Sequence, residues 1–420
     1  MKSSCGRPLS ICYAVPGHNL FEESGPSRNV LSVANALSQK ADTTVVFRKI
    51  IHSIEEHPFK ILEFDPAYPI PAEPLDDSAI RGTSIVDFIH YLQKLKRFVR
   101  ETSSRFDIIL EKSWILSGYL SAAYRRHGIP GVLVENIVWK WNEPINDPRN
   151  LLRYLYYKCA QFMIGRYLKR VPAIIAETDA LKIAMVNRWT VCESKIHVVD
   201  LGVDRQLFQP MDQRKARSEL RIAQDDVLLL YVGVMDQSHD LSPVIEALKR
   251  KSPANVALHL VGKGILLEKY KSLSSGTTKV VFHGYVPHKM VPLYIASADL
   301  CLAPYDSCAF PDGKIPYSML KVHEYLACGR PVIGVPSRRM SELVQSNVTG
   351  FILENQAEAW EAFLDELPTR RMLRTLAQNV LAQYTHHGWN ETAEKYLAIC
   401  TDLMEQASGV GRVLGCPKKA

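Results

Sequence analysis

The chain has 420 residues, of which 47% are hydrophobic and 23% charged, and its formal net charge is +7. This composition is typical of a globular protein with a sizeable core, and it excludes disordered, collagen-like and low-complexity character. The charge is too modest for a dedicated nucleic-acid binder, so we expect no nucleic-acid partner. At roughly 100 to 200 residues per domain, the length predicts two or three domains, and we favour two.

Features that would direct the chain to a membrane or out of the cell are not apparent in the sequence. The apolar run 9–15 is short and is interrupted by Ser10, unlike a secretory signal. No segment approaches the roughly 20 apolar residues that span a bilayer, so membrane contact would be peripheral. The nine cysteines form no Cys-x-x-Cys pair typical of zinc or redox sites. We therefore expect a cytoplasmic protein.

Short apolar, β-branched runs alternate with longer mixed segments, which predicts strands separated by helices. One series covers 9–15, 43–47, 107–111, 132–135, 173–177 and 196–200. A second covers 227–232, 256–262, 279–283, 299–303, 331–335 and 351–353. This alternation is typical of parallel sheets, which bind ligands at the carboxyl ends of their strands. We predict two α/β domains joined by the turn-rich segment 202–210.

The loop after the first predicted strand contains two candidate binding residues. Gly25 lies just before a predicted helix, where it would let backbone N–H groups approach a phosphate at the positive end of that helix. A plain turn is the alternative, because the Gly-x-Gly-x-x-Gly spacing of dinucleotide binders is absent. His18 could contact an acceptor molecule or be a solvated loop residue.

The segment 318–333 is the most informative in the chain. Lys321 and Glu324 are three residues apart, so they share one face of a helix near its beginning. An amine there can meet a diphosphate, and a carboxylate can accept hydrogen bonds from ribose hydroxyls. From spacing alone we would favour an ordinary surface ion pair.

This segment is similar to the donor-site signature of family 4 glycosyltransferases, in which a basic residue and a glutamate precede Tyr-Leu-Ala-x-Gly-x-Pro-Val. Segments 200–210, 231–233, 260–264, 283–287 and 341–351 follow in the family's order. The resemblance implies the GT-B fold, with two Rossmann-like parallel-sheet domains facing each other across a cleft. It places an acceptor domain at 1–204, a nucleotide-sugar donor domain at 205–380, and a segment at 381–420 whose helix crosses back to the first domain.

The resemblance also implies an activity. It implies a retaining glycosyltransferase that moves a sugar from a nucleotide-diphosphate sugar to a hydroxyl of a lipid, glycan or small molecule, with no essential metal or other cofactor. Lys321, Glu324, Val286 and Gly25 are the expected donor-binding residues. On the acceptor side, Asn136 follows a predicted strand and could hydrogen-bond a sugar hydroxyl.

Two departures from the family pattern bear on the mechanism. The family commonly has a second glutamate eight residues before the first, where this chain has Pro316. The loop after the donor domain's first strand has Val234 and His239 where an arginine and a lysine are usual. We therefore expect Lys321 to be the principal diphosphate contact. His239 would assist as a cation if nearby phosphates raise its pKa.

Further cations at the donor could come from Lys314 or Arg330. If the missing charge is not replaced, the alternative function is a catalytically weakened GT-B protein that binds a sugar nucleotide or a partner without transfer. An epimerase has no support, because no recognisable carboxylate and histidine set is present.

Two basic stretches bear on the acceptor. The segment 85–100 has a helical apolar stripe bordered by lysines and arginines, and it could lie on an anionic membrane surface or face the core. The segment 149–170 has apolar residues all round its helix, which indicates burial or an interface. If these helices lie on a lipid surface, the protein would be peripheral on the inner face of a membrane. The alternative is that their apolar sides face the protein core.

Overall fold

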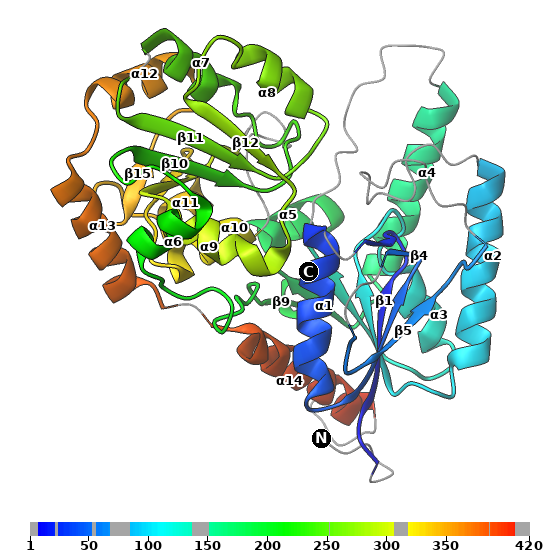
Figure 1. The fold of residues 1–420 in the computed structure, drawn as a ribbon. Coiled ribbons are helices and arrows are strands. Elements are labelled where there is room, and N and C mark those ends of the chain that lie inside the picture. The colour runs from blue at the N-terminus through cyan, green and yellow to red at the C-terminus, as the bar shows by residue number, and fades with distance from the viewer. Residues whose placement is uncertain are drawn as a thin grey trace. The chain divides into compact units, whose positions relative to one another are not determined.

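The computed structural model describes residues 7–21, 24–52, 56–67, 85–136, 151–251, 253–305, 318–385 and 387–407. These residues form two compact units. The first takes in the described residues up to Leu201, together with Ser318 and Trp389–Ala407, and the second takes in the other described residues between Gly202 and Gly388. Each unit is a parallel sheet with helices packed on it (Figure 1), which confirms the predicted α/β class.

The sheet of the first unit has the strand order β5-β3-β1-β6-β7-β8-β9, and all neighbouring strands are parallel. Its central strands are almost continuous apolar runs because helices cover both faces. The strands are β1 (Ser10–Val15), β3 (Asp42–Phe47), β5 (Lys60–Glu63), β6 (Ile108–Lys112), β7 (Gly131–Glu135), β8 (Ala173–Ala176) and β9 (Ile196–Val198). A separate pair consists of β2 (Leu20–Phe21) and β4 (Ile50–His52).

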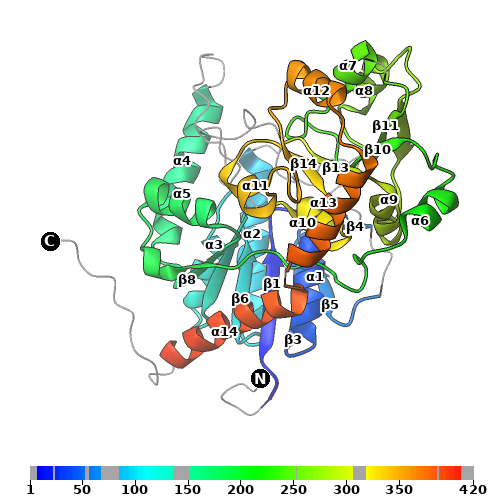
Figure 2. The ribbon, with the colours of Figure 1, turned by 90° about the vertical axis from the view of Figure 1, so that its left-hand side faces the viewer.

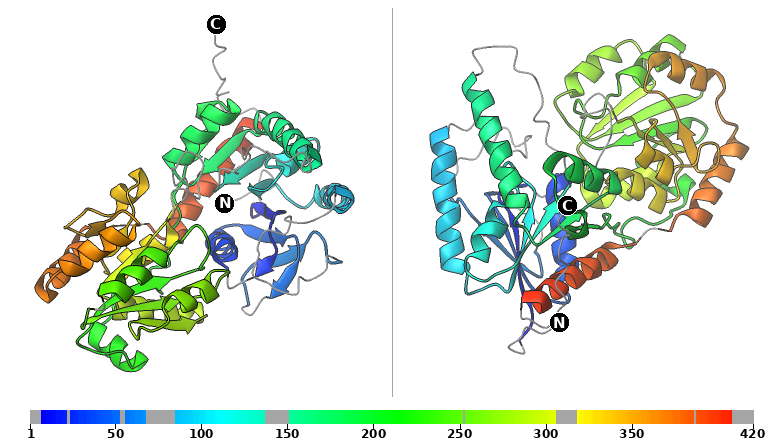
Figure 3. Two further views of the ribbon diagram at one scale, coloured as in Figure 1. Left: turned by 90° about the horizontal axis from the view of Figure 1, so that it is seen from above. Right: turned by 180° about the vertical axis from the view of Figure 1, so that it is seen from behind.

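Helices from both ends of the chain cover this sheet. One face carries α1 (Gly25–Ser38) and α14 (Trp389–Ala407), which pack side by side in Figure 1. The other face carries α2 (Ile85–Thr102), α3 (Tyr119–Arg125) and α4 (Leu151–Leu168), seen from behind in Figure 3. Near β9 lie α5 (Asp179–Trp189) and the 3₁₀ turn η2 (Glu193–Lys195).

The apolar stripe of α2 faces the core of the first unit. Phe88, Tyr91, Leu95 and Val99 are all buried in the cluster beneath the helix. This is the core-facing alternative for the segment 85–100, and it leaves the basic residues on the outer side. Within the described part of the chain, no helix is long and apolar enough to cross a membrane.

The sheet of the second unit has the strand order β12-β11-β10-β13-β14-β15 and is again parallel throughout. One face carries α7, α8, α12 and α13, with α7 beside α12 in Figure 2, and the other carries α9 and α10, with α6 packed on α9. The strands are β10 (Val227–Val232), β11 (Val256–Val261), β12 (Val280–Gly284), β13 (Leu300–Ala303), β14 (Val332–Gly334) and β15 (Gly350–Ile352). The helices are α6 (Gln213–Leu220), α7 (Ser242–Lys251), α8 (Leu267–Leu273), η3 (His288–Met290), α9 (Val291–Ser297), α10 (Leu320–Ala327), α11 (Arg338–Leu343), α12 (Ala357–Asp365) and α13 (Arg370–Gln383).

Candidate functional site

The topology of the second sheet marks one place for a ligand. The chain builds β10, β11 and β12 outward in one direction and then returns to add β13, β14 and β15 on the other side of β10. In such sheets ligands bind beyond the carboxyl ends of the two strands at which the direction reverses. Here Gly233 follows β10 and Tyr305 lies just beyond β13, while α10 brings Lys321 close to both.

Glycines allow two loops to pack backbone against backbone at this edge. Gly233 and Gly262 have φ angles of 146° and 133°, which favour glycine. A Cβ on Gly262 would lie 2.0 Å from the Gly233 carbonyl oxygen, and one on Gly264 would lie 2.2 Å from that of Met235. A Cβ on Gly233 would lie 2.9 Å from Lys321 Nζ. The loops therefore form a narrow backbone shelf against the lysine.

Lys321 is held by aromatic side chains. Its Nζ donates a 3.0 Å hydrogen bond to the Tyr231 hydroxyl, which donates a 2.5 Å bond to the Val234 carbonyl. The same Nζ lies 4.4 Å from the centre of the Tyr231 ring and 5.5 Å from that of Tyr305, where cation–π attraction favours the charged amine. Burial nevertheless lowers the pKa of Lys321 to about 7, opposed by the charges of Asp236 and Glu324.

His239 is part of the same cluster, but its pKa is shifted downward. Burial and the nearby Lys321 charge lower the pKa of His239 to about 4, so the ring is neutral at pH 7. Its Nδ1 lies 2.9 Å from Asp236 Oδ1. Burial alone would raise the pKa of Asp236, but hydrogen bonds from His239 and Ser238 lower it to about 2. The neutral ring therefore donates from Nδ1 to an ionised carboxylate, and the raised pKa expected for His239 beside bound phosphates stays a prediction.

Glu324 lies one helical turn beyond Lys321, but the two do not form the simple surface ion pair that spacing alone favoured. Lys321 is hydrogen-bonded to Tyr231, and the Glu324 side chain is 16% exposed with its Oε1 3.7 Å from Nε2 of His288. Both groups are partly withdrawn from water on one face of α10. The Lys321 amine and the Glu324 carboxylate are thus two separate groups at this edge of the sheet and do not pair with each other.

The remaining donor-side predictions have different outcomes. Val286 follows β12 and is half-buried. Lys314 lies outside the described residues. Sequence reasoning assigned no role to Lys263, which lies between Gly262 and Gly264 and places its Nζ 5.0 Å from the Tyr285 ring. A lysine between two glycines directly after a strand was the available signal.

The first unit has a corresponding switch point between β1 and β6. A Cβ on Gly17 would lie 2.6 Å from Trp114 Cβ, so the loop after β1 packs tightly on the segment after β6. His18 in this loop is half-buried. Asn136, just after β7, accepts a 2.5 Å hydrogen bond from the Ser113 hydroxyl. These two acceptor-side predictions therefore follow strands β1 and β7 of one sheet.

Asn19 is a residue at this edge that sequence reasoning did not single out. Its side chain is 1% exposed, and neither Nδ2 nor Oδ1 has a hydrogen-bond partner among the described residues. Such a buried amide costs roughly 1 to 3 kcal/mol for each unsatisfied group, which a bound hydroxyl would offset. By contrast, Gly25 begins α1 with open space where a Cβ would stand, and its donor assignment stays a prediction.

Comparisons with known proteins bear on both units. Residues 24–207 match the family described as Glycosyltransferase Family 4, and residues 226–369 match that described as Glycosyl transferases group 1. The chain is 25% identical over 215 residues to TuaH of Bacillus subtilis, a putative teichuronic acid biosynthesis glycosyltransferase, covering 50% of this chain and 52% of TuaH. It thus spans about half the length of that relative. It is 24% identical to D-inositol 3-phosphate glycosyltransferase 1 of Catenulispora acidiphila, covering 72% and 74% of the two chains.

Solved structures resemble the fold across nearly the whole chain. Sucrose-phosphate synthase from Thermosynechococcus elongatus superposes with a TM-score of 0.71 at 18% identity, covering 95% of this chain and all of that one. Anabaena HepE in complex with UDP and glucose gives a TM-score of 0.68 at 16% identity, covering 94% and 99%. These likenesses agree with the two-domain architecture expected from the sequence.

Proposed function

Because the chain belongs to the family 4-like glycosyltransferases of the GT-B fold, we propose that it transfers a sugar from a nucleotide-diphosphate sugar to an acceptor hydroxyl, with retention of anomeric configuration. The observation that carries the proposal is the desolvated amine of Lys321, which stands against a glycine shelf at the switch point of the second sheet. The nucleotides in the Anabaena HepE complexes, UDP and UDP-glucose, make UDP-sugars the first donors to try.

On the donor side, Lys321 supplies positive charge next to the diphosphate oxygen on which negative charge develops. As the bond from the anomeric carbon to the diphosphate breaks, negative charge grows on the leaving oxygen, and the Lys321 ammonium, held by the Tyr231 hydroxyl, stabilises it. The glycines let the loops after β10 and β11 pack backbone against backbone beside Lys321, at the strand ends where we place the phosphates. Glu324 accepts hydrogen bonds from the ribose hydroxyls.

On the acceptor side, the protein holds the acceptor hydroxyl in position for the reaction. The acceptor oxygen bonds to the anomeric carbon on the face that the diphosphate leaves, and its proton passes to the departing phosphate oxygen. In that scheme the protein provides no nucleophile. We assign the binding of the acceptor to Asn19, His18 and Asn136. The assignment of Asn19 has the strongest support, because its buried amide has no hydrogen-bond partner among the described residues.

The alternative of a binding protein without transfer rests on the loop after β10. Val234 is 49% exposed where a family cation would stand, and His239 is neutral at pH 7. We favour transfer because Lys321 and Lys263 both lie at this edge of the sheet and offer positive charge that does not depend on His239.

One assay separates these functions. The purified chain is incubated with radiolabelled UDP-, GDP- and ADP-sugars, with and without EDTA, and release or transfer of the labelled sugar is measured. We expect turnover of one donor that persists in EDTA, and NMR of the product will give its anomeric configuration. Nucleotide-sugar binding in calorimetry without any turnover would support the binding protein instead.

A further inference from the structure

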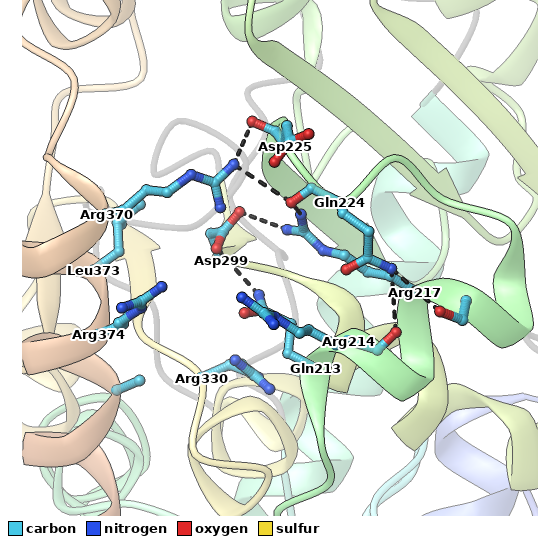
Figure 4. A pocket seen from close by; sticks show the side chains of 12 residues that line it. Gln213, Arg214, Arg217, Gln224, Asp225, Asp299, Arg330, Arg370, Leu373 and Arg374 are labelled. Carbon is cyan, nitrogen blue, oxygen red and sulfur yellow. Dashed lines mark hydrogen bonds and ion pairs between the residues drawn. The ribbon is translucent and has the colours of Figure 1, made fainter.

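A polar pocket lies in the second unit, away from the site around Lys321. It has a volume of about 540 Å³, within the usual range for small-molecule sites, and Figure 4 shows its side chains. Five arginines and two aspartates contribute to its lining, which gives a formal charge of +3: Arg214, Arg217, Arg330, Arg370, Arg374, Asp225 and Asp299.

Two of the lining residues, Arg217 and Asp299, form a buried ion pair that holds the surrounding elements together. Arg217 is 2% exposed, and its Nη2 donates a 2.6 Å hydrogen bond to Asp299 Oδ2. Its other nitrogens donate to carbonyl oxygens, including that of Ser297 at 2.8 Å. Asp299 in turn accepts from the Leu228 amide at 2.7 Å. This pair joins α6 to the starts of β10 and β13, and its charges largely offset each other.

The other arginines are not neutralised in this way. Arg214 and Arg374 come from α6 and α13, and their side chains form no hydrogen bond or ion pair among the described residues. Arg330 is largely withdrawn from solvent, and its Nε is buried without a hydrogen-bond partner in the described part of the chain. The one side-chain hydrogen bond that Arg330 makes within the described residues is a long 3.4 Å bond from Nη2 to the Met211 carbonyl. Arg370 already donates to backbone carbonyls at the rim.

The cost of this arrangement points to a ligand. Three guanidinium groups from separate segments converge on one cavity, where they repel one another. Burial lowers the pKa of Arg330, which reflects the desolvation of its charge. An anion with several oxygens would satisfy the Arg330 Nε and relieve the repulsion, because guanidinium groups bind phosphate oxygens in pairs of parallel hydrogen bonds.

We propose that this pocket is a second ligand site, which binds a small soluble organic phosphate with two or more negative charges through Arg214, Arg330 and Arg374. It is separate from the donor site, because Asp225, Asp299 and Arg330 precede β10, β13 and β14 whereas the donor site follows the ends of β10 and β13. The six residues of β10 separate the two edges of the sheet by about 20 Å.

Fructose 1,6-bisphosphate serves as the probe in a calorimetric titration of the full chain. We expect binding that weakens about tenfold or more for each of Arg214→Ala and Arg374→Ala, since each removes charge-assisted hydrogen bonds. Both side chains are exposed, so these variants keep the packing of the unit. Arg371→Ala is the matched control, because Arg371 is an exposed neighbour on α13 outside the pocket, and its affinity should equal that of the wild type.

Further arms of the experiment separate this pocket from other sites. Lys321→Ala should leave bisphosphate affinity unchanged, and the Arg214→Ala/Arg374→Ala double variant should bind UDP as the wild type does. The proposal is overturned if the double variant keeps full bisphosphate affinity, if the wild type binds none, or if Arg371→Ala weakens binding as much as the pocket variants. Loss of binding to anionic phosphatidylglycerol vesicles in the double variant, with no affinity for the soluble probe, would overturn the assignment to a soluble ligand.

Discussion

Lys321 combines two properties that oppose each other, a positive charge and a desolvated setting. Its amine hydrogen-bonds to Tyr231 and faces two aromatic rings. Such a preorganised cation acts most on charge that grows towards the transition state. We expect Lys321→Ala to reduce the transfer rate roughly 10²- to 10³-fold and to weaken donor binding less. Steady-state kinetics and calorimetry on a confirmed donor check this, and wild-type turnover would remove Lys321 from the chemistry.

The lowered pKa of Lys321 gives a pH dependence with a definite sign. The protonated amine is the form that meets a diphosphate, so kcat/KM should be highest below pH 7 and fall as the pH rises through about 7. Lys321→Arg should abolish this alkaline limb, because a guanidinium stays charged. His239 is already neutral at pH 7, so His239→Gln should leave the limb in place. A limb that responds only to His239→Gln would assign it to the histidine.

Glu324 should act on binding more than on rate. Its carboxylate lies near His288 and is free of a direct bond to Lys321, so it can accept from ribose hydroxyls. Glu324→Ala should weaken nucleotide binding by roughly 1 to 3 kcal/mol, the cost of a lost hydrogen bond to a charged group. Calorimetry with the nucleoside diphosphate measures this directly. Unchanged affinity would place Glu324 outside the nucleotide site.

Among the elements, sequence patterns predicted strands well where apolar runs are continuous. The predicted run 227–232 coincides with β10, and 256–262 exceeds β11 by one residue. The edge strand β5 was missed because its two apolar residues stand between two charged ones and none of the four is fully buried. Lys321 and Glu324, the proposed donor residues, could be singled out because they lie three residues apart in a segment that resembles a family signature. The grouping of the pocket arginines could not be predicted, because α6, the segment before β14 and α13 meet only in the folded unit.

The glycine shelf can be tested by separating steric contact from backbone conformation. Gly262 and Gly276 both have positive φ angles, 133° and 85°, but a Cβ on Gly276 would meet no atom within 4 Å. Gly276→Ala should therefore cost only about 1 to 2 kcal/mol from the backbone alone. Gly262→Ala should cost more and should also weaken donor binding, because it forces the two loops apart. Urea unfolding and calorimetry of both variants check this, and equal costs would contradict the close packing of the shelf.

At the scale of the whole molecule, each unit has its own core, and the last described helix belongs to the first of them. Tyr396 of α14 is 1% exposed within that core, whereas Lys395 beside it is exposed. Tyr396→Ala should cost the first unit roughly 3 to 5 kcal/mol, as do other large aromatic truncations in cores. Lys395→Ala should change stability by about 0.5 kcal/mol or less. Urea unfolding followed by hydrogen exchange should show protection lost in α1 and β1, and loss confined to the second unit would contradict this assignment.

The return of α14 to the first unit also sets the order in which the protein can be completed during synthesis. Chain segments leave the ribosome from the amino terminus, so domains usually finish folding in that order. Here the first unit begins first but lacks the helix that covers α1 until the second unit has been made in full. The second unit can therefore finish folding while the first unit still exposes the apolar face of α1 that α14 later covers. A released chain that ends at Gly388 should accordingly contain a folded second unit and an incomplete first one, and it should bind chaperones more than the full chain does.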